Sequence, residues 1–325
     1  MESFEKKSSL HHAERKENIM KKDLLKLLDL TPNDITKILD IGDRLKSELK
    51  NGIKHDFPAG KTLAMIFSKN STRTRVSFEV GMFQLGGHAL FLSTSDSQLS
   101  RGEEIRDTAR NLSRYCDGIM IRTYHQSEVE EFAHYASIPV INGLTDFAHP
   151  CQTLADLMTI REHKGKLAGL KACWIGDGNN VANSTIVGCL KIGMNVSAAC
   201  PEGYHPDKQI LDFADSVNAE GMVKFELSDN PKAAAKNADV IFTDVWTSMG
   251  QEAESAARLN AFKGYIVNDD IMALANPGCM VQHCLPAHKG EEICEKVFEE
   301  HADEIFDEAE NRLHVQKAIM YLLMK

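Results

Sequence analysis

Short apolar runs alternate along this chain with longer stretches whose apolar residues recur at helical spacing. The runs are nearly continuous in apolar residues, which is typical of strands buried on both faces. The predicted strands are Thr62–Phe67, Ala89–Leu92, Gly118–Ile121, Pro139–Ile141, Ala172–Ile175, Val196–Ala199, Val240–Thr243, Ile266–Val267 and Met280–Gln282. This alternation predicts an α/β fold with parallel sheets covered by helices on both faces.

Capping residues and glycines mark the helix boundaries. Thr31 followed by Pro32 predicts a helix start, since Thr is a good N-cap and Pro fits the first helical position. A second helix is predicted over Thr72–Leu85, with Gly86 after its last turn. A domain boundary is expected near Gly165. The simplest layout is two α/β halves with a cleft at the carboxyl ends of their strands.

Composition and charge narrow the function classes. The 325 residues are 43% hydrophobic and carry a formal net charge of -10. Nucleic acid is not expected as a partner, because binding polyphosphate requires a basic face. A membrane is not expected either, because no run approaches the roughly 20 apolar residues of a spanning helix. A small anion would need a local cluster of positive groups to hold it.

The N-terminal segment and the cysteines bear on the compartment. Residues 1–20 have no apolar region and mix acidic with basic side chains, so we expect a disordered tail or an extension. The eight cysteines form no C-x-x-C pair, and several lie within apolar runs. This usage predicts buried, reduced thiols in a cytoplasmic protein, without a disulfide framework or a zinc ribbon.

The segment Ser71-Thr72-Arg73-Thr74-Arg75 concentrates three hydroxyls and two guanidiniums in five residues. It lies between a predicted strand and a predicted helix, so free N–H groups and the positive end of the helix dipole face the cleft. Hydroxyls and N–H groups can satisfy the oxygens of a phosphate, and arginine adds bidentate charge pairing. We interpret the segment as a phosphate grip. A capped helix start with solvated arginines is the alternative.

Further polar groups follow other predicted strands. His149 and Gln152 stand at a helix start, where they can bind a carbonyl oxygen and an amide. Arg122 ends the strand Gly118–Ile121 and points to the same edge of the cleft. Taken alone, His149 is better interpreted as a structural histidine, and Arg122 as an ordinary surface arginine.

The turn Gly176–Asn180 is similar to a dinucleotide-binding loop. Val181 stands where the third glycine of G-x-G-x-x-G belongs, so the NAD signal is weak. We interpret the segment as a tight strand–helix turn that presents Asn180.

The segments after two later strands supply candidate groups for binding an amine. Asp244 follows the strand Val240–Thr243, and the polar stretch Gln251–Arg258 is typical of a mobile lid. Leu285-Pro286 is a candidate cis peptide, and Cys284 is a candidate thiol with an altered pKa.

Metal catalysis is not expected. His283 and Cys284 are neighbours in an extended segment, so strand alternation would point them to opposite faces. The sequence contains no H-E-x-x-H motif and no obvious carboxylate cluster. We expect neither a metal nor a cofactor.

Together the five motifs resemble the aspartate/ornithine transcarbamylase family from about Lys22 to the C-terminus. S-T-R-T-R and H-P-x-Q resemble its carbamoyl phosphate signature, whereas D-x-x-x-S-M-G and H-C-L-P resemble its ornithine branch. In the aspartate branch, an arginine-bearing loop is expected at the H-C-L-P position. One departure is Ser68, where relatives often have an acid before the lysine; it lies outside the contact residues.

The resemblance implies an architecture and an assembly. The fold would be two doubly wound parallel-sheet domains joined by two interdomain helices. Residues 21–163 plus 306–325 would bind carbamoyl phosphate, and residues 164–305 would bind ornithine. The assembly would be a homotrimer in which each active site borrows a loop around Gln98 from a neighbour. Assembly beyond the trimer stays open.

The resemblance also implies residue roles by position. Carbamoyl phosphate would contact Ser71, Thr72, Arg73, Thr74, Gln98, Arg122, His149, Gln152, the Leu285 carbonyl and Arg312. L-Ornithine would contact Asn180, Asp244, Ser248, Met249 and Cys284. Catalytic roles would fall to Arg73, Arg122, His149, Asp244 and Cys284.

The implied reaction transfers a carbamoyl group from carbamoyl phosphate to the δ-amine of L-ornithine, giving L-citrulline and phosphate. The amine must first lose a proton, since its pKa resembles that of lysine, ~10.4. Whether the reaction serves arginine biosynthesis or catabolism stays open.

Three alternatives remain to be tested. A carbamoyltransferase for another amine, such as putrescine, is disfavoured by the S-M-G loop, because a diamine has no α-carboxylate for that loop to hold. An NAD-dependent dehydrogenase is disfavoured by the missing third glycine. An inactive regulatory relative is disfavoured because every matched contact residue is present.

Overall fold

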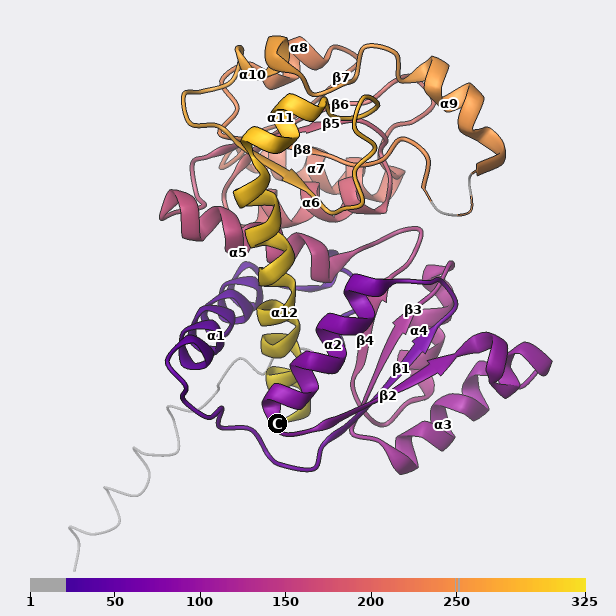
Figure 1. The fold of residues 1–325 in the computed structure, drawn as a ribbon. Helices are drawn as coiled ribbons and strands as arrows, with labels where there is room; N and C mark the ends of the chain where they lie inside the picture. Colours follow the sequence, from indigo (N-terminus) through magenta and orange to yellow (C-terminus); the bar gives the residue numbers. More distant parts are fainter. Residues whose placement is uncertain (1–21, 249, 251) are drawn as a thin grey trace, which may run out of the picture.

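The computed structural model describes residues 22–325 except 249 and 251, and its strands form two parallel sheets (Figure 1). The first sheet has the order β2-β1-β3-β4, and the second has the order β7-β6-β5-β8-β9. Every paired strand in both sheets is parallel. The predictions for residues 1–20 and for Met249 lie outside the described residues.

The elements follow one another in regular alternation. The first sheet and its helices comprise α1 (Pro32–Lys50), β1 (Thr62–Phe67), α2 (Thr72–Leu85), β2 (His88–Ser93), α3 (Ile105–Tyr115), β3 (Gly118–Arg122), α4 (Gln126–Tyr135) and β4 (Val140–Leu144), with 3-10 turns η1 (Leu27–Asp29), η2 (Thr94–Asp96) and η3 (Gln98–Arg101). The second comprises β5 (Lys171–Ile175), α6 (Asn180–Lys191), β6 (Asn195–Ala199), α7 (Lys208–Glu220), β7 (Phe225–Ser228), α8 (Pro231–Ala235), β8 (Val240–Thr243), η4 (Glu252–Glu254), α9 (Ser255–Ala261), α10 (Asp269–Met272), β9 (Met280–His283) and α11 (Glu295–Glu300). Two long helices, α5 (Pro150–Lys164) and α12 (Ala302–Met324), lie between the two groups.

Every predicted strand but one is confirmed. The prediction of a strand at Ile266–Val267 is wrong, because Val267 makes only an isolated bridge to Ile293. The pattern also missed β7, an edge strand in which Phe225 alone is buried. Both errors concern short segments, where only the neighbouring backbone decides whether a strand forms.

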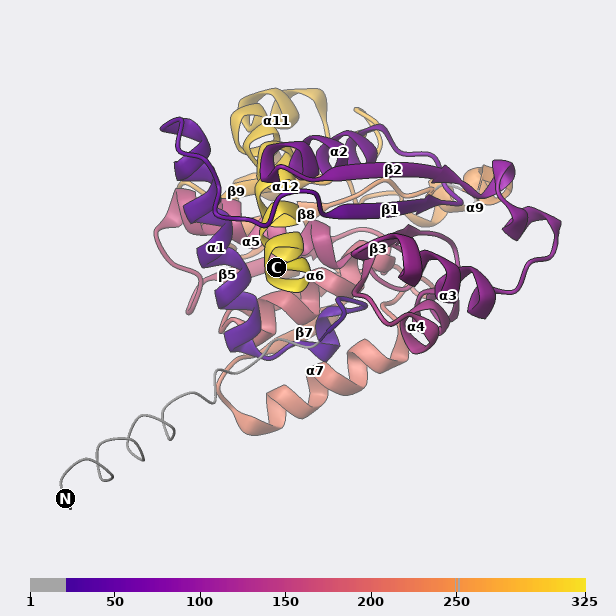
Figure 2. The same ribbon diagram turned by 90° about the horizontal axis from the view of Figure 1, so that it is seen from below.

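Alternation along β1 shows why the strands read as continuous apolar runs. Leu63 and Met65 belong to one buried cluster, whereas Ala64 and Ile66 belong to another. Successive side chains therefore pack on opposite faces of the sheet. Figure 2 shows α2 on one side of β1 and β2, and α3 and α4 on the other.

The predicted helix boundaries are confirmed by their caps. Thr31 forms a capping box with Asp34, and Pro32 is the first residue of α1. Gly86 ends α2 in the left-handed conformation, with φ of 84°.

The two interdomain helices are confirmed. In Figure 1, α12 runs from the second sheet to the first, and it packs against α5, α1 and α2. A single buried apolar cluster contains residues of both sheets, for example Met65 of β1 and Trp174 of β5. Among the residues described, no helix is long and apolar enough to span a bilayer.

A buried polar contact fastens these helices to each other. Asn311 of α12 donates to the Thr159 hydroxyl of α5 at 2.9 Å and to Glu162 at 2.7 Å, and it accepts from Lys46 of α1 at 2.7 Å. Asn311 is fully buried, so its removal would leave these groups without a partner in an apolar surrounding.

We expect Asn311→Ala to lower the free energy of unfolding by about 2–3 kcal/mol, because several buried hydrogen bonds are lost together. Urea unfolding followed by circular dichroism measures the change. Asn33→Ala, the same substitution at an exposed position of α1, should change it by less than about 0.5 kcal/mol. Equal effects of the two variants would contradict this account of the helix contact.

Candidate active site

A cavity of about 1210 Å³ lies where the carboxyl ends of strands from both sheets face each other. Arg122 is the last residue of β3, and Asp244 and Cys284 directly follow β8 and β9. Parallel strands bring their carboxyl ends to one edge of a sheet, so residues distant in sequence share one wall. The first sheet supplies one wall of the cavity and the second supplies the other.

The phosphate-grip segment forms the start of α2. Ser71 is the N-cap, and its hydroxyl accepts from the backbone N–H of Thr74 at 3.1 Å. Ser71, Thr72 and Arg73 all line the cavity. The positive end of the helix dipole therefore faces the cavity, as the sequence predicted.

Three arginines converge on this wall. Thr74 Oγ1 accepts from Arg122 Nη1 at 3.3 Å and from Arg312 Nη2 at 3.0 Å, and Arg73 Nη2 donates to the Leu285 carbonyl at 2.5 Å. The Nε atoms of Arg122 and Arg312 are buried and have no hydrogen-bond partner among the described residues.

The electrostatics of the arginine cluster favour an anion. Burial and the charge of Arg312 lower the pKa of Arg122 to about 10, and the same two causes lower the pKa of Arg73. A lowered arginine pKa means that the positive charges are desolvated and repel one another. A bound anion with several oxygen acceptors would relieve both costs.

His149 lies beside the arginines as a neutral imidazole. Burial, followed by the charges of Arg312, Arg122 and Arg73, holds its pKa well below the usual 6.5. Its Nδ1 is buried without a hydrogen-bond partner among the described residues, and its backbone N–H donates to Ser184 at 2.8 Å. A neutral imidazole in this position can donate one hydrogen bond to a carbonyl oxygen.

A buried acidic pair lies behind this wall. Gln152 Nε2 donates to Asp156 at 2.9 Å and to Glu308 at 2.7 Å. Burial raises the pKa of Asp156 to about 7, and burial together with Asp156 raises that of Glu308 well above its usual value. Sequence reasoning missed this pair, although Asp156 is one helical turn beyond Gln152 and so shares its face of α5.

The opposite wall holds Asp244 between two donors. Cys284 Sγ donates to Asp244 Oδ1 at 3.1 Å, and Asn179 donates to Oδ2 at 2.9 Å. Burial and the neighbouring Asp244 raise the pKa of Cys284 well above 9.0, so the thiol stays protonated. Cys284 does have an altered pKa, but the change is away from an activated thiolate. Asn179, which fixes the carboxylate, was missed.

The turn after β5 confirms part of its sequence interpretation. Asn180 lines the cavity, but its amide donates to the Thr145 carbonyl at 2.6 Å and accepts from Val181 at 3.0 Å. A Cβ at Gly178 would lie 2.2 Å from the backbone nitrogen of Pro206. The glycine therefore allows the chain's own backbone to approach closely, rather than a dinucleotide.

Arg258 fastens the polar stretch after β8. Arg258 of α9 is buried, and it donates to Asp177 at 2.8 Å and to the Trp246 carbonyl at 3.0 Å. This ion pair connects α9 to the turn after β5.

Most of the predicted contact residues meet at one cavity. Those that line it are Ser71, Thr72, Arg73, Arg122, His149, Asn180, Asp244, Ser248, Cys284, Leu285 and Arg312. Thr74 and Gln152 are fully buried behind the lining. Gln98 lies on η3 and is not part of this lining.

The expectation that His283 and Cys284 point to opposite faces is wrong. Ligand atoms of His283, Cys284 and Asp244 lie within 4.8 Å of one another, because β9 ends at His283 and strand alternation stops there. Both ring nitrogens of His283 already make hydrogen bonds, to Glu292 and to the backbone of Leu285. The Leu285–Pro286 peptide is cis, as predicted.

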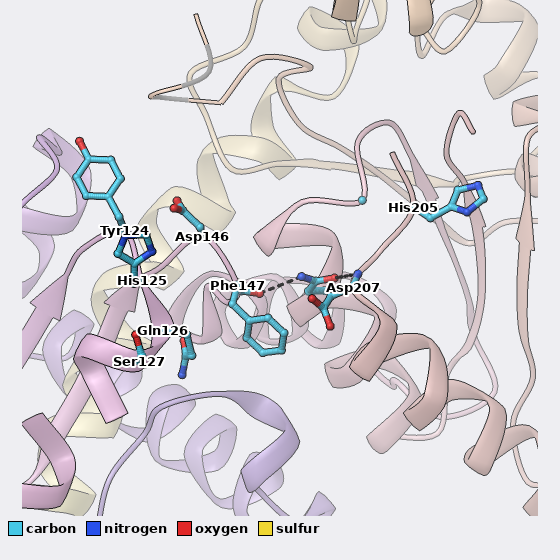
Figure 3. Close-up of a pocket in the computed structure, with 10 residues that line it drawn as sticks. Tyr124, His125, Gln126, Ser127, Asp146, Phe147, His205 and Asp207 are labelled. Atoms are coloured by element: carbon cyan, nitrogen blue, oxygen red, sulfur yellow. Dashed lines mark hydrogen bonds between the residues drawn. The ribbon is translucent and has the colours of Figure 1, made fainter. Parts of the chain in front are cut away.

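A smaller pocket of about 480 Å³ adjoins the cavity (Figure 3). Figure 3 shows Tyr124 and His125 on one side of it and His205 on the other. Asn183 bridges its floor, donating to the Phe147 carbonyl at 3.0 Å and accepting from the backbone of Asp207 at 3.0 Å. None of the described residues that line this pocket is an arginine, whereas Arg73, Arg122 and Arg312 line the larger cavity.

Comparison with known families decides the identity. The carbamoyl-P binding domain of aspartate/ornithine carbamoyltransferases matches residues 22–162, and the Asp/Orn binding domain of the same family matches residues 168–323. The chain belongs to the aspartate/ornithine carbamoyltransferase family.

Individual relatives within this family are named for ornithine. The ornithine carbamoyltransferase of Carboxydothermus hydrogenoformans is 56% identical, with 93% of this chain and 97% of that protein covered. That of Geobacter metallireducens is 54% identical, covering 94% and 100%. The structure of the Pyrococcus furiosus enzyme is similar, with a TM-score of 0.89 and 52% identity over 94% of this chain and 98% of that chain.

The acidic pair gives this carbamoyltransferase a pH-dependent stability. Asp156 has a higher pKa in the folded state, about 7, than the 3.8 of a free side chain. The folded state therefore binds more protons between pH 4 and 7, and the free energy of unfolding falls as the pH rises through that window.

We expect Asp156→Asn to remove this loss, so that the unfolding free energy of the variant minus that of the wild type increases from pH 4 to 7. Urea unfolding at fixed protein concentration across this range measures the difference. Asp212→Asn, the same substitution at an exposed helix position, should give a difference that varies by less than about 0.5 kcal/mol. A pH-independent difference for Asp156→Asn would contradict the raised pKa.

Proposed function

We propose that this carbamoyltransferase moves the carbamoyl group of carbamoyl phosphate to the δ-amine of L-ornithine, giving L-citrulline and phosphate. The observation that carries the proposal is the pairing of two walls. One wall presents three arginines beside a neutral histidine, and two of them, Arg122 and Arg312, have a buried Nε without an acceptor among the described residues. The other wall presents a carboxylate held by a neutral thiol. The relatives named ornithine carbamoyltransferase support ornithine as the amine.

The first wall would bind and polarise carbamoyl phosphate. The hydroxyls and N–H groups of Ser71, Thr72 and Thr74 at the start of α2, together with Arg73 and Arg312, would hold the phosphate. Arg122, His149 and Thr74 would donate to the carbamoyl oxygen as negative charge grows on it. One such donor contributes about 2.7–4 kcal/mol in comparable oxyanion sites.

The carbamoyl nitrogen requires acceptors instead of donors. The Leu285 carbonyl lines the cavity and can take a second hydrogen bond beside the one from Arg73. Gln152 donates its nitrogen to Asp156 and Glu308, so its oxygen is left over, and that oxygen is buried without a partner among the described residues. Both oxygens would accept from the carbamoyl N–H groups.

The second wall would hold the amine. Asp244 would attract the δ-ammonium and orient the neutral amine after proton loss, and Cys284 would keep the carboxylate in place. Asn180, Ser248 and Met249 would bind the α-amino and α-carboxylate groups of ornithine. Attack on the carbamoyl carbon expels phosphate, and orientation with preorganised charge suffices without a covalent intermediate.

The relatives and the thiols support a physiological setting for the proposed reaction. A relative from Pyrococcus furiosus, 53% identical, is named an anabolic ornithine carbamoyltransferase, which supports a role in arginine biosynthesis. All eight cysteines are free thiols, and most are buried, which supports a reducing cytoplasm as the working compartment.

A homotrimer with shared active sites fits the surface of the first domain. β2 is an edge strand of its sheet, and apolar side chains beside it are exposed: Phe83 by 80%, Val76 by 50% and Leu90 by 39%. An exposed edge strand with apolar neighbours is suited to burial against another protomer. Gln98 follows this strand and would reach a neighbour's phosphate from there.

Replacing Arg73 tests the anion site. We expect Arg73→Gly to lower kcat by at least about 10³-fold and to weaken carbamoyl phosphate binding, because the leaving phosphate loses its charge partner. Steady-state kinetics measures the loss, and near-UV circular dichroism checks the fold. Arg114→Gly, the same change on an exposed turn of α3, should leave the kinetics unchanged. Near-normal turnover of Arg73→Gly would show that Arg73 does not belong to the anion site.

Subunit mixing tests the shared site. Gln98→Ala and Arg73→Gly alter opposite sides of one interface, so each alone is expected to be nearly inactive. Mixed trimers of the two variants should regain activity, because some of their sites combine an intact Arg73 with an intact Gln98. Mixing Arg73→Gly with Arg122→Gly should restore nothing, since both residues belong to the same protomer's wall. Failure of the first mixture to regain activity would overturn the sharing.

A further inference from the structure

Leu285 has an unusual backbone conformation at the cavity wall. Its φ is 57°, in the left-handed region that a branched side chain rarely occupies. Such a conformation is energetically unfavourable and persists only where the surroundings enforce it. The contacts that enforce it therefore decide where the Leu285 carbonyl points.

A histidine holds the Leu285 backbone from behind. The Leu285 N–H donates to His283 Nδ1 at 2.9 Å. Because a backbone N–H can only donate, Nδ1 must carry a lone pair, and the imidazole proton is on Nε2. His283 is buried and lies at the end of β9, so its ring is held by the sheet.

A buried carboxylate fixes that tautomer. His283 Nε2 donates to Glu292 Oε1 at 2.9 Å, and the backbone N–H of His288 donates to the same oxygen at 2.6 Å. The side chains of His283 and Glu292 are both fully buried. A carboxylate accepts and cannot donate, so it keeps the proton on Nε2 and leaves Nδ1 free to accept from Leu285.

The buried position of the Glu292 carboxylate is not explained by a need to anchor the segment around Glu292. The segment is already held by backbone bonds, from Val267 to the Glu292 carbonyl at 2.8 Å and from Cys294 to the Val267 carbonyl at 3.0 Å. Glu292 Oε2 has no partner among the described residues, so burying the charge is costly. A cost of this kind calls for a role beyond loop anchoring.

We propose that Glu292 and His283 are positioning residues that aim the Leu285 carbonyl at the carbamoyl nitrogen. The proposal rests on the proposed function, in which this carbonyl accepts an N–H of carbamoyl phosphate. Glu292 fixes the tautomer of His283, His283 fixes the backbone conformation of Leu285, and the Leu285 carbonyl would accept from the amide of the substrate. We call these three residues the relay. The relay thereby contributes to recognising a carbamoyl group in preference to another acyl group.

Acetyl phosphate is the probe that isolates this contact. It carries the same phosphate and carbonyl as carbamoyl phosphate, but a methyl group replaces the amide nitrogen, so it has no N–H for Leu285. We expect the wild-type enzyme to bind carbamoyl phosphate more tightly than acetyl phosphate. The ratio of the carbamoyl phosphate dissociation constant to the acetyl phosphate inhibition constant measures this preference.

Two variants of His283 form a matched pair. His283→Asn places an amide oxygen near the position of Nδ1 and keeps the acceptor for Leu285. His283→Gln extends its amide toward the position of Nε2 and lacks that acceptor. We expect His283→Gln to weaken carbamoyl phosphate binding about 10-fold and acetyl phosphate binding by less than about 3-fold. His283→Asn should change both by less than about 3-fold.

A third variant acts one step further from the substrate. Glu292→Gln keeps the volume, but its amide can present N–H₂ to the imidazole and draw the ring proton to Nδ1, next to the Leu285 N–H. We expect it to weaken carbamoyl phosphate binding about 3- to 10-fold and to spare acetyl phosphate. It also provides the test if the His283 variants do not fold.

The outcomes separate this proposal from the proposed function. If the wild type does not discriminate between the two phosphates, the Leu285 assignment itself fails. If the wild type discriminates and both His283→Gln and Glu292→Gln discriminate equally well, the relay is wrong. A loss of affinity for both ligands alike, or the same loss in His283→Asn as in His283→Gln, would mark a merely structural role and also overturn the relay.

Discussion

Three arginines desolvated beside one another are the constraint on which the rest of this structure depends. Arg73, Arg122 and Arg312 come from α2, β3 and α12, and their mutual repulsion and burial depress the pKa values of the first two. Among the described residues, the Thr74 hydroxyl accepts from Arg122 and Arg312, and the Leu285 carbonyl accepts from Arg73. The desolvation and repulsion of these arginines destabilise the folded state, and a bound anion from outside the chain would offset both.

The fold supports that cluster through its two long connecting helices. α12 carries Arg312 to the cavity and Asn311 to the contact with α5 and α1, so one helix serves both the site and the joint between domains. The acidic pair Asp156 and Glu308 lies on these same helices. Because burial favours its protonated form, the pair can accept from Gln152 without neutralising the arginine wall completely.

Polarity divides the cavity into parts with different tasks. The arginines and His149 are donors, which in the proposed function would face the oxygens of carbamoyl phosphate, whereas the carbonyl of Leu285 is an acceptor that would face its amide. Asp244 completes the second wall, and neutral Cys284 and Asn179 orient it. In the proposed reaction, these fixed donors and acceptors would favour one orientation of carbamoyl phosphate and one approach of the amine, and this orientation would lower the barrier.

The sequence by itself determined the strands, the helix caps and the motifs at strand ends, because apolar period, capping and turn chemistry are local properties. It therefore located Ser71, Arg122, His149 and Asp244 after the carboxyl ends of predicted strands, on the cleft between the two halves. Only the tertiary structure decided what depends on distant neighbours. It turned Val267 into an isolated bridge, gave Gly178 its close approach to Pro206, kept Cys284 protonated and placed Asn179, Asp156 and Glu308 in support of the site. Burial and pKa depend on residues that the fold brings together from separate segments, such as Asp244 and Cys284, which lie on different strand ends, and no local pattern records such contacts.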